Sequence, residues 1–176
     1  MKSLLLVSGS TRGGSVNAAV LATVAAEVGR EARTARHRGI GGLPHFNPDL
    51  DRDPVPTPVA ELRNAIDSAT AVLFSTPEYA GTMPGALKNL LEWTIGATVL
   101  SGKPVGWVNP STAPARAAGT YAALRTVLGY TGAELVPGAL ADIPVPRSAI
   151  GPDGTVADAA LRAGLGDVAR RLLAAA

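Results

Sequence analysis

The chain has 176 residues, of which 47% are hydrophobic and 17% charged, and its formal net charge is only +2. This composition is typical of a single folded domain spanning residues 1–176 and excludes global disorder. The absence of cysteine excludes disulfides and thiol catalysis, and two histidines are too few for a histidine-based metal cluster. No basic block favours nucleic-acid binding. We expect a cytoplasmic protein without a metal site, because no apolar run approaches a membrane helix and the amino terminus lacks a secretory pattern.

The first half of the chain alternates short apolar runs with longer helical patterns. "SLLLVS" at residues 3–8 predicts a buried parallel strand, and residues 17–28 predict a helix. "ARTARH" at residues 32–37 is typical of a polar edge strand. The glycine- and proline-rich residues 38–58 predict a long surface loop, which a helix near residues 59–68 follows.

The second half continues the same alternation. Strands are predicted at residues 70–76, 103–109 and 133–140, with helices at residues 84–95 and 119–128 between them. A last helix is expected from about Thr155, with an apolar stripe made by Leu161, Leu165, Val168 and Leu172.

Five strands with intervening helices predict an α/β fold, a three-layer, doubly wound, five-stranded parallel sheet with right-handed crossovers. With strand order 2-1-3-4-5 the fold is flavodoxin-like. Such sheets bind ligands beyond the carboxyl ends of their strands, where the strand order reverses.

The loop after the first strand, "GSTRGGSVN" at residues 9–17, is rich in small hydrogen-bond donors and contains no acid. Glycines allow a tight turn, Arg12 adds a cation, and the start of the following helix offers unpaired N–H groups to an anion. The loop lacks the lysine of nucleoside-triphosphate loops and the glycine spacing of dinucleotide loops. It suits a phosphate monoester, although Ser15 is also the residue type that simply caps a helix.

The loop after the third strand lies within "STPEYAGTMPGALKNLLEW" at residues 75–93. Pro77 and Tyr79 would give a rigid platform for a flat heterocycle. On the following helix, Lys88 and Glu92 are spaced for an ion pair, and Trp93 is expected to be half exposed until a partner subunit covers it. The face that should pack on the sheet contains Leu87, Leu90, Leu91 and Thr94.

Together, these two loops strongly resemble the NAD(P)H-dependent FMN reductase family, a flavodoxin-like group, and "AALRTVLGYTGAELVP" resembles its later helix and fifth strand. The resemblance implies that FMN is held by Ser10, Arg12, Ser15, Val16 and Asn17 around its phosphate, and by Pro77, Glu78, Tyr79, Ala80, Ser111 and Thr112 around its isoalloxazine ring. Ala80 stands where the family usually carries asparagine.

The resemblance further implies hydride transfer from NADPH or NADH to FMN and then to a quinone, an azo compound, a metal oxyanion or free flavin, without a catalytic side chain. It implies a homodimer or a dimer of dimers, and allows a monooxygenase that receives reduced FMN. Two alternatives remain. One is a flavodoxin-like one-electron carrier, which the positive net charge disfavours, and the other is a flavin-free binding or regulatory module. His37 and His45 are expected to be solvated, without a ligand role.

Overall fold

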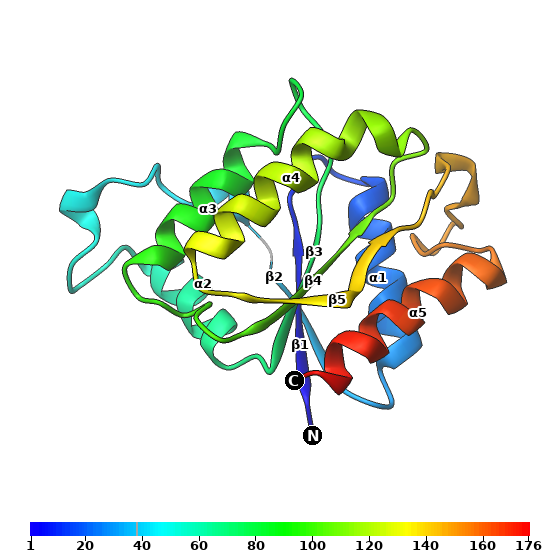
Figure 1. The fold of residues 1–176 in the computed structure, drawn as a ribbon, viewed down its shortest axis with the longest axis horizontal. Helices are drawn as coiled ribbons and strands as arrows, with labels where there is room; N and C mark the ends of the chain where they lie inside the picture. Colours follow the sequence, from blue (N-terminus) through cyan, green and yellow to red (C-terminus); the bar gives the residue numbers. More distant parts are fainter. Residues whose placement is uncertain (38) are drawn as a thin grey trace.

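The computed structural model describes residues 1–37 and 39–176, so that Arg38, the first residue of the expected long loop, lies outside the described residues. Its centre is a five-stranded sheet in the order β2-β1-β3-β4-β5 (Figure 1). All four strand pairs are parallel. The strands are β1 (Ser3–Ser8), β2 (Arg33–His37), β3 (Ala71–Ser75), β4 (Pro104–Asn109) and β5 (Glu134–Asp142). The predicted strand order is therefore confirmed.

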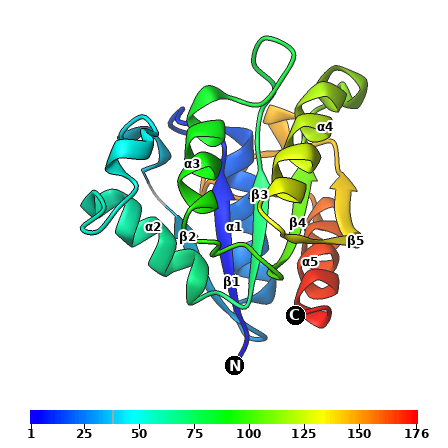
Figure 2. The same ribbon diagram turned by 60° about the vertical axis from the view of Figure 1, so that its left-hand side comes forward.

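Helices cover both faces of the sheet, which gives three layers (Figures 1 and 2). Helices α1 (Val16–Val28) and α5 (Ala159–Ala174) pack on one face. Helices α2 (Thr57–Asp67), α3 (Gly85–Ile95) and α4 (Pro114–Tyr130) pack on the other. Because both faces are covered, the central strands are apolar without alternation.

Side-chain alternation along β1 divides the core into two clusters. Leu5 and Val7 pack with α2, α3 and α4, whereas Leu4 and Leu6 pack with α1 and α5. Successive side chains of a strand point to opposite faces, so one continuous apolar run serves both layers.

Two helices begin four or five residues away from their predicted starts. The last helix begins at Ala159 rather than near Thr155, because Asp158 accepts a hydrogen bond from the N–H of Leu161 at 2.8 Å and so caps it. The segment before this cap contains an antiparallel bridge between Ile150 and Val156. Helix α4 begins at Pro114, earlier than expected, since proline suits a first helical turn.

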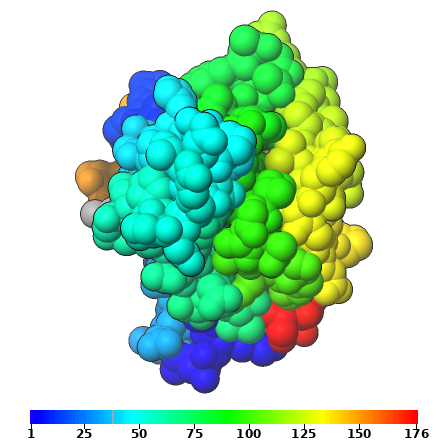
Figure 3. Space-filling model, turned by 90° about the vertical axis from the view of Figure 1, so that its left-hand side faces the viewer, coloured from blue at the N-terminus to red at the C-terminus, as the bar shows by residue number. Residues whose placement is uncertain are grey.

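The expectation that Trp93 is half exposed is wrong: its side chain is 0% exposed. Its indole N–H donates to the carbonyl oxygen of Pro44 at 2.8 Å, and Phe46 packs edge-on against the ring at 5.0 Å between centroids. Figure 3 shows this part of the chain, in cyan, lying against the green surface of α3. Trp93 therefore gives no support to a partner subunit at this face.

Candidate functional site

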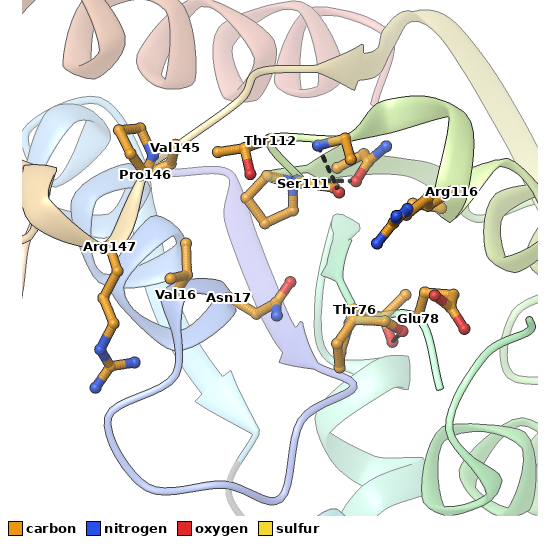
Figure 4. A pocket seen from close by; sticks show the side chains of 15 residues that line it. Val16, Asn17, Thr76, Glu78, Ser111, Thr112, Arg116, Val145, Pro146 and Arg147 are labelled. Atoms are coloured by element: carbon orange, nitrogen blue, oxygen red, sulfur yellow. Dashed lines mark hydrogen bonds between the residues drawn. The ribbon is translucent and has the colours of Figure 1, made fainter. Parts of the chain in front are cut away.

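A pocket of about 530 Å³ opens beyond the carboxyl ends of β1, β3 and β4 (Figure 4). It lies where a doubly wound sheet places its ligand. Its walls come from the start of α1, the loop after β3, the loop after β4 with the first turn of α4, and the segment after β5. The lining residues are Val16, Asn17, Thr76, Pro77, Glu78, Asn109, Pro110, Ser111, Thr112, Ala113, Arg116, Ala117, Val145, Pro146 and Arg147.

The loop after β1 begins in close contact with the end of β3. The N–H of Gly9 donates to the carbonyl oxygen of Ser75 at 2.9 Å. A Cβ atom on Gly9 would collide with the hydroxyl of Thr76, so glycine is required for this approach. This contact brings the loop after β1 beside the loop after β3.

Two serines of the first loop stabilise the loop itself. The Oγ of Ser15 accepts a hydrogen bond from the N–H of Ala18 at 3.1 Å, which caps α1. The Oγ of Ser10 accepts one from the N–H of Arg12 at 3.2 Å. Neither serine nor Arg12 lines the pocket; Ser10 instead borders a separate depression near His37. Ser15 therefore caps α1, which is the simpler of the two roles that the sequence allowed.

Asn17 is the polar side chain that α1 directs into the pocket (Figure 4). Its Oδ1 accepts a hydrogen bond from the hydroxyl of Ser75 at 2.9 Å, which leaves the amide NH2 group as a donor. Within residues 1–37 and 39–176, the N–H groups of Val16 and Asn17 have no acceptor. These donors, together with the positive end of the α1 dipole, fit a phosphate group.

The loop after β3 supplies one wall and then turns away as a hairpin. Thr76, Pro77 and Glu78 line the pocket. Tyr79 and Ala80 do not: Tyr79 is 49% exposed and pairs with Thr82 across a tight turn in which Ala80 has a φ of 53°. The carboxylate of Glu78 accepts a hydrogen bond from the N–H of Gly81, which closes this turn.

The loop after β4 is held by Asn109, which the sequence did not single out. The Asn109 amide donates to Asp142 at 2.7 Å, and its Oδ1 accepts from the N–H of Ser111 at 3.1 Å. Ser111 in turn accepts from the N–H of Ala113. The expected residues Ser111 and Thr112 therefore line the pocket from a loop with a fixed shape.

Two arginines of the pocket wall were also missed. Arg116 lies in the first turn of α4, and Arg147 lies in the segment after β5. Within the described part of the chain, neither forms an ion pair with a carboxylate. Arg116 was missed because α4 was predicted to begin at residue 119 rather than at Pro114. Nothing in the sequence pattern after β5 indicated Arg147. The pocket is thus more cationic than the sequence suggested.

Tyr121 of α4 contacts the backbone of β4 and of the loop after β3 next to the pocket. Its phenol oxygen lies 3.0 Å from the carbonyl oxygens of Thr76 and Val108. Burial raises the pKa of the Tyr121 phenol well above its usual value. The group therefore stays protonated and acts as a hydrogen-bond donor between the ends of β3 and β4.

Comparison with known proteins identifies the family to which this chain belongs. The sequence profile of the family described as NADPH-dependent FMN reductase matches residues 1–143. The chain belongs to this family. It is thereby a member of an oxidoreductase family whose flavin is FMN and whose electron donor is a reduced nicotinamide. The residues that follow Ile143, including Arg147 of the pocket wall, lie outside the matched segment.

Individual relatives agree with this assignment. An NAD(P)H-dependent FMN reductase of Pseudomonas aeruginosa is 36% identical over 61% of this chain and 59% of its own length. A quinone reductase of Pseudomonas putida is 33% identical over 73% of this chain and 70% of its own. The flavoenzyme NAD(P)H:(acceptor) oxidoreductase FerB of Paracoccus denitrificans superposes with a TM-score of 0.76 at 29% identity, over 98% of this chain and 96% of that chain.

Two features are absent from the residues that the structure describes. No helix there is both long enough and apolar enough to cross a membrane. No group of three or more histidine, aspartate or glutamate side chains in the same part of the chain is arranged to hold a metal ion.

Proposed function

We propose that this protein binds FMN in the pocket described above and transfers hydride from NADH or NADPH, through the flavin, to a small acceptor. The main support is that one pocket contains both the N–H donors of Val16 and Asn17, which have no acceptor among the described residues, and the wall formed by Pro77 and Glu78. The chain also belongs to an FMN reductase family. The FMN phosphate would lie at the start of α1, and the ring between the loops after β3 and β4.

FMN, when bound, supplies the hydride chemistry. The chain's own residues bind and orient it. The N–H groups of Val16 and Asn17 and the Asn17 amide would donate hydrogen bonds to the phosphate. Pro77 restricts the backbone beside the ring, and Asn109 fixes the facing loop that carries Ser111. Ser10, Arg12 and Ser15 would act through the shape and charge of the loop after β1.

The acceptor we propose is a quinone or another flat oxidant, such as an azo compound or free flavin; metal oxyanions are a further candidate. The printed names of the relatives support the first, since they include a quinone reductase of Pseudomonas putida and a 2-hydroxy-1,4-benzoquinone reductase of Burkholderia. Transfer of reduced FMN to a separate monooxygenase would appear as FMN that leaves readily and turns over as a substrate.

Anaerobic mixing tests the reductase activity. The FMN-loaded protein should lose its flavin absorbance when NADH or NADPH is added, and a quinone should restore it. A protein that binds FMN but stays oxidised with both donors would be a carrier rather than a reductase. A protein that binds no FMN would be a flavin-free module.

Asn17→Asp tests the phosphate position with almost no change of shape. The aspartate keeps an acceptor for the Ser75 hydroxyl but replaces the amide donor with a negative charge. We expect FMN binding to weaken by roughly 100-fold, because a donor becomes a repelling anion. Riboflavin, which lacks the phosphate, should lose far less affinity.

We also propose a homodimer. Exposed apolar side chains at Ile95 and Tyr130, on the outer helices α3 and α4, are the surface observation in favour of this assembly. Gel filtration at micromolar concentration should give twice the mass of one chain, and a clean monomer with full activity would contradict it.

A further inference from the structure

The segment after β5 forms a wall of the pocket although it lies beyond the part of the chain that the family profile matches. It contributes Val145, Pro146 and Arg147 to the same pocket lining as Val16 and Asn17. Figure 4 shows Arg147 extending beside the loop that precedes Val16. The segment therefore belongs to a part of the chain that the family profile does not describe.

This segment is fixed at both of its ends. The N–H of Val145 donates to the carbonyl oxygen of Pro110 at 3.0 Å, and the Val145 side chain is buried. At the other end, the N–H of Val156 donates to the hydroxyl of Thr23 in α1 at 2.8 Å, in a fully buried contact. Arg147 therefore extends from a structured turn between two anchors, and its position relative to α1 is defined.

The guanidinium of Arg147 contacts the loop after β1 directly. Its Nη1 donates to the carbonyl oxygen of Gly14 at 3.3 Å. Gly14 has a φ of 61°, a conformation that glycine adopts without strain. In a trans peptide the C=O and the following N–H point in opposite directions. A Gly14 carbonyl held toward Arg147 therefore directs the N–H of Ser15 away from Arg147.

We propose that Arg147 is a positioning residue for the FMN phosphate: it holds the Gly14–Ser15 peptide with its N–H toward the phosphate and adds positive charge to this end of the pocket. The inference rests on the proposed function. The loop between Ser8 and Asn17 contains no acid, and within residues 1–37 and 39–176 Arg147 has no carboxylate partner. Its charge therefore stays unpaired and attracts a phosphate dianion through space, across the Gly14–Ser15 peptide.

The contribution should be specific for the phosphate. A residue that merely shaped the pocket would affect FMN and riboflavin equally, because the two share the ring and the ribityl chain. A residue that orients a donor and adds charge at the phosphate should change FMN binding alone, and its effect should shrink as salt screens the charge.

The experiment measures dissociation constants for FMN and riboflavin by flavin fluorescence in wild type, Arg147→Ala, Arg147→Lys and Arg30→Ala. Arg30 is an exposed arginine just beyond the far end of α1, so its removal gives the same change of net charge away from the pocket. We expect Arg147→Ala to weaken FMN binding roughly tenfold and riboflavin binding less than twofold. Arg147→Lys should recover part of the loss, and Arg30→Ala should change neither constant.

Two outcomes would overturn the inference: FMN affinity unchanged in Arg147→Ala, or an equal loss for FMN and riboflavin. Both presuppose that wild type binds FMN. A wild type that does not bind FMN would contradict the proposed function itself, so the two failures are distinguishable. Circular dichroism of each variant checks that the fold is retained.

Discussion

The phenol of Tyr121 lies 3.0 Å from the carbonyl oxygen of Thr76, at the point where β3 ends and the pocket begins. The same oxygen lies 3.0 Å from the carbonyl of Val108 in β4. The paired register of β3 and β4 ends at Phe74 and Trp107, before both of these carbonyls. Tyr121 therefore connects the two strands where their own ladder has stopped, which keeps the loops after β3 and β4 at a defined separation.

Tyr121→Phe should lower the free energy of unfolding by about 1–2 kcal/mol, because it leaves buried carbonyls without their donor while the aromatic ring stays in place. Urea denaturation measures the change. Tyr130→Phe is the matched control: the Tyr130 side chain is 85% exposed in the single chain, and the substitution keeps the aromatic ring that we propose for the dimer surface, so it should make no difference. Equal midpoints for the two variants would contradict a bridging role for Tyr121.

Gly119 should be required for the hairpin after β3 to stay close to α4. A Cβ atom on Gly119 would collide with the carbonyl oxygen of Gly81, whereas one on Gly129 of the same helix would meet nothing within 4 Å. Gly119→Ala should therefore destabilise the fold by about 1–3 kcal/mol and weaken FMN binding. Gly129→Ala should stabilise it by about 0.5–1 kcal/mol through helix propensity. A stability gain for both variants would show that the hairpin does not depend on Gly119.

Ala80 should be a site of backbone strain. Its φ of 53° is a left-handed conformation that L-residues with a Cβ adopt at a cost of about 1–2 kcal/mol. Ala80→Gly should raise the free energy of unfolding by about 0.5 kcal/mol, since relief of strain exceeds the entropy that glycine adds to the unfolded chain. Ala122→Gly, at an exposed position inside α4, should instead lower it by about 1 kcal/mol. Thermal unfolding compares the two, and a loss in both would refute strain at Ala80.

His37 is partly buried rather than solvated as expected. It should therefore make the fold less stable in acid. Burial lowers the pKa of His37 below its ordinary value of 6.5, although Glu61 opposes the shift. Above pH 6.5 the histidine is neutral in both states; below it, the unfolded chain takes up the proton first, so stability falls as the pH falls toward the folded-state pKa. Urea midpoints between pH 7.5 and 5 should show this slope. His37→Gln should flatten it and His45→Gln should keep it; an unchanged slope in His37→Gln would contradict the assignment.

The sequence predicted the central strands and the packing face of α3 because both depend on local periodicity. The order of the strands followed instead from the flavodoxin-like fold. The apolar runs of β1 and β3 and the spacing of Leu87, Leu90 and Leu91 were sufficient, and all of these side chains are buried. The expected ion pair of Lys88 with Glu92 is present at 2.5 Å, since residues four apart are neighbours on any helix.

Features that depend on contacts between distant segments could not be predicted in the same way. Trp93 is buried by Pro44 and Phe46, which lie in a loop with no periodic pattern. Arg147 reaches Gly14 from far along the chain. The order of the strands brings the loops after β1, β3 and β4 together, so the expected residues Asn17, Pro77 and Ser111 line one pocket. The pocket wall after β5 has no motif in the sequence that would have indicated it.

A crystal structure of the protein with FMN tests the central claim most directly. We expect the phosphate oxygens at about 2.7–3.2 Å from the N–H groups of Val16 and Asn17, with the ring between Pro77 and Ser111. An FMN molecule with its phosphate at Arg116 instead, or bound outside this pocket, would contradict the account.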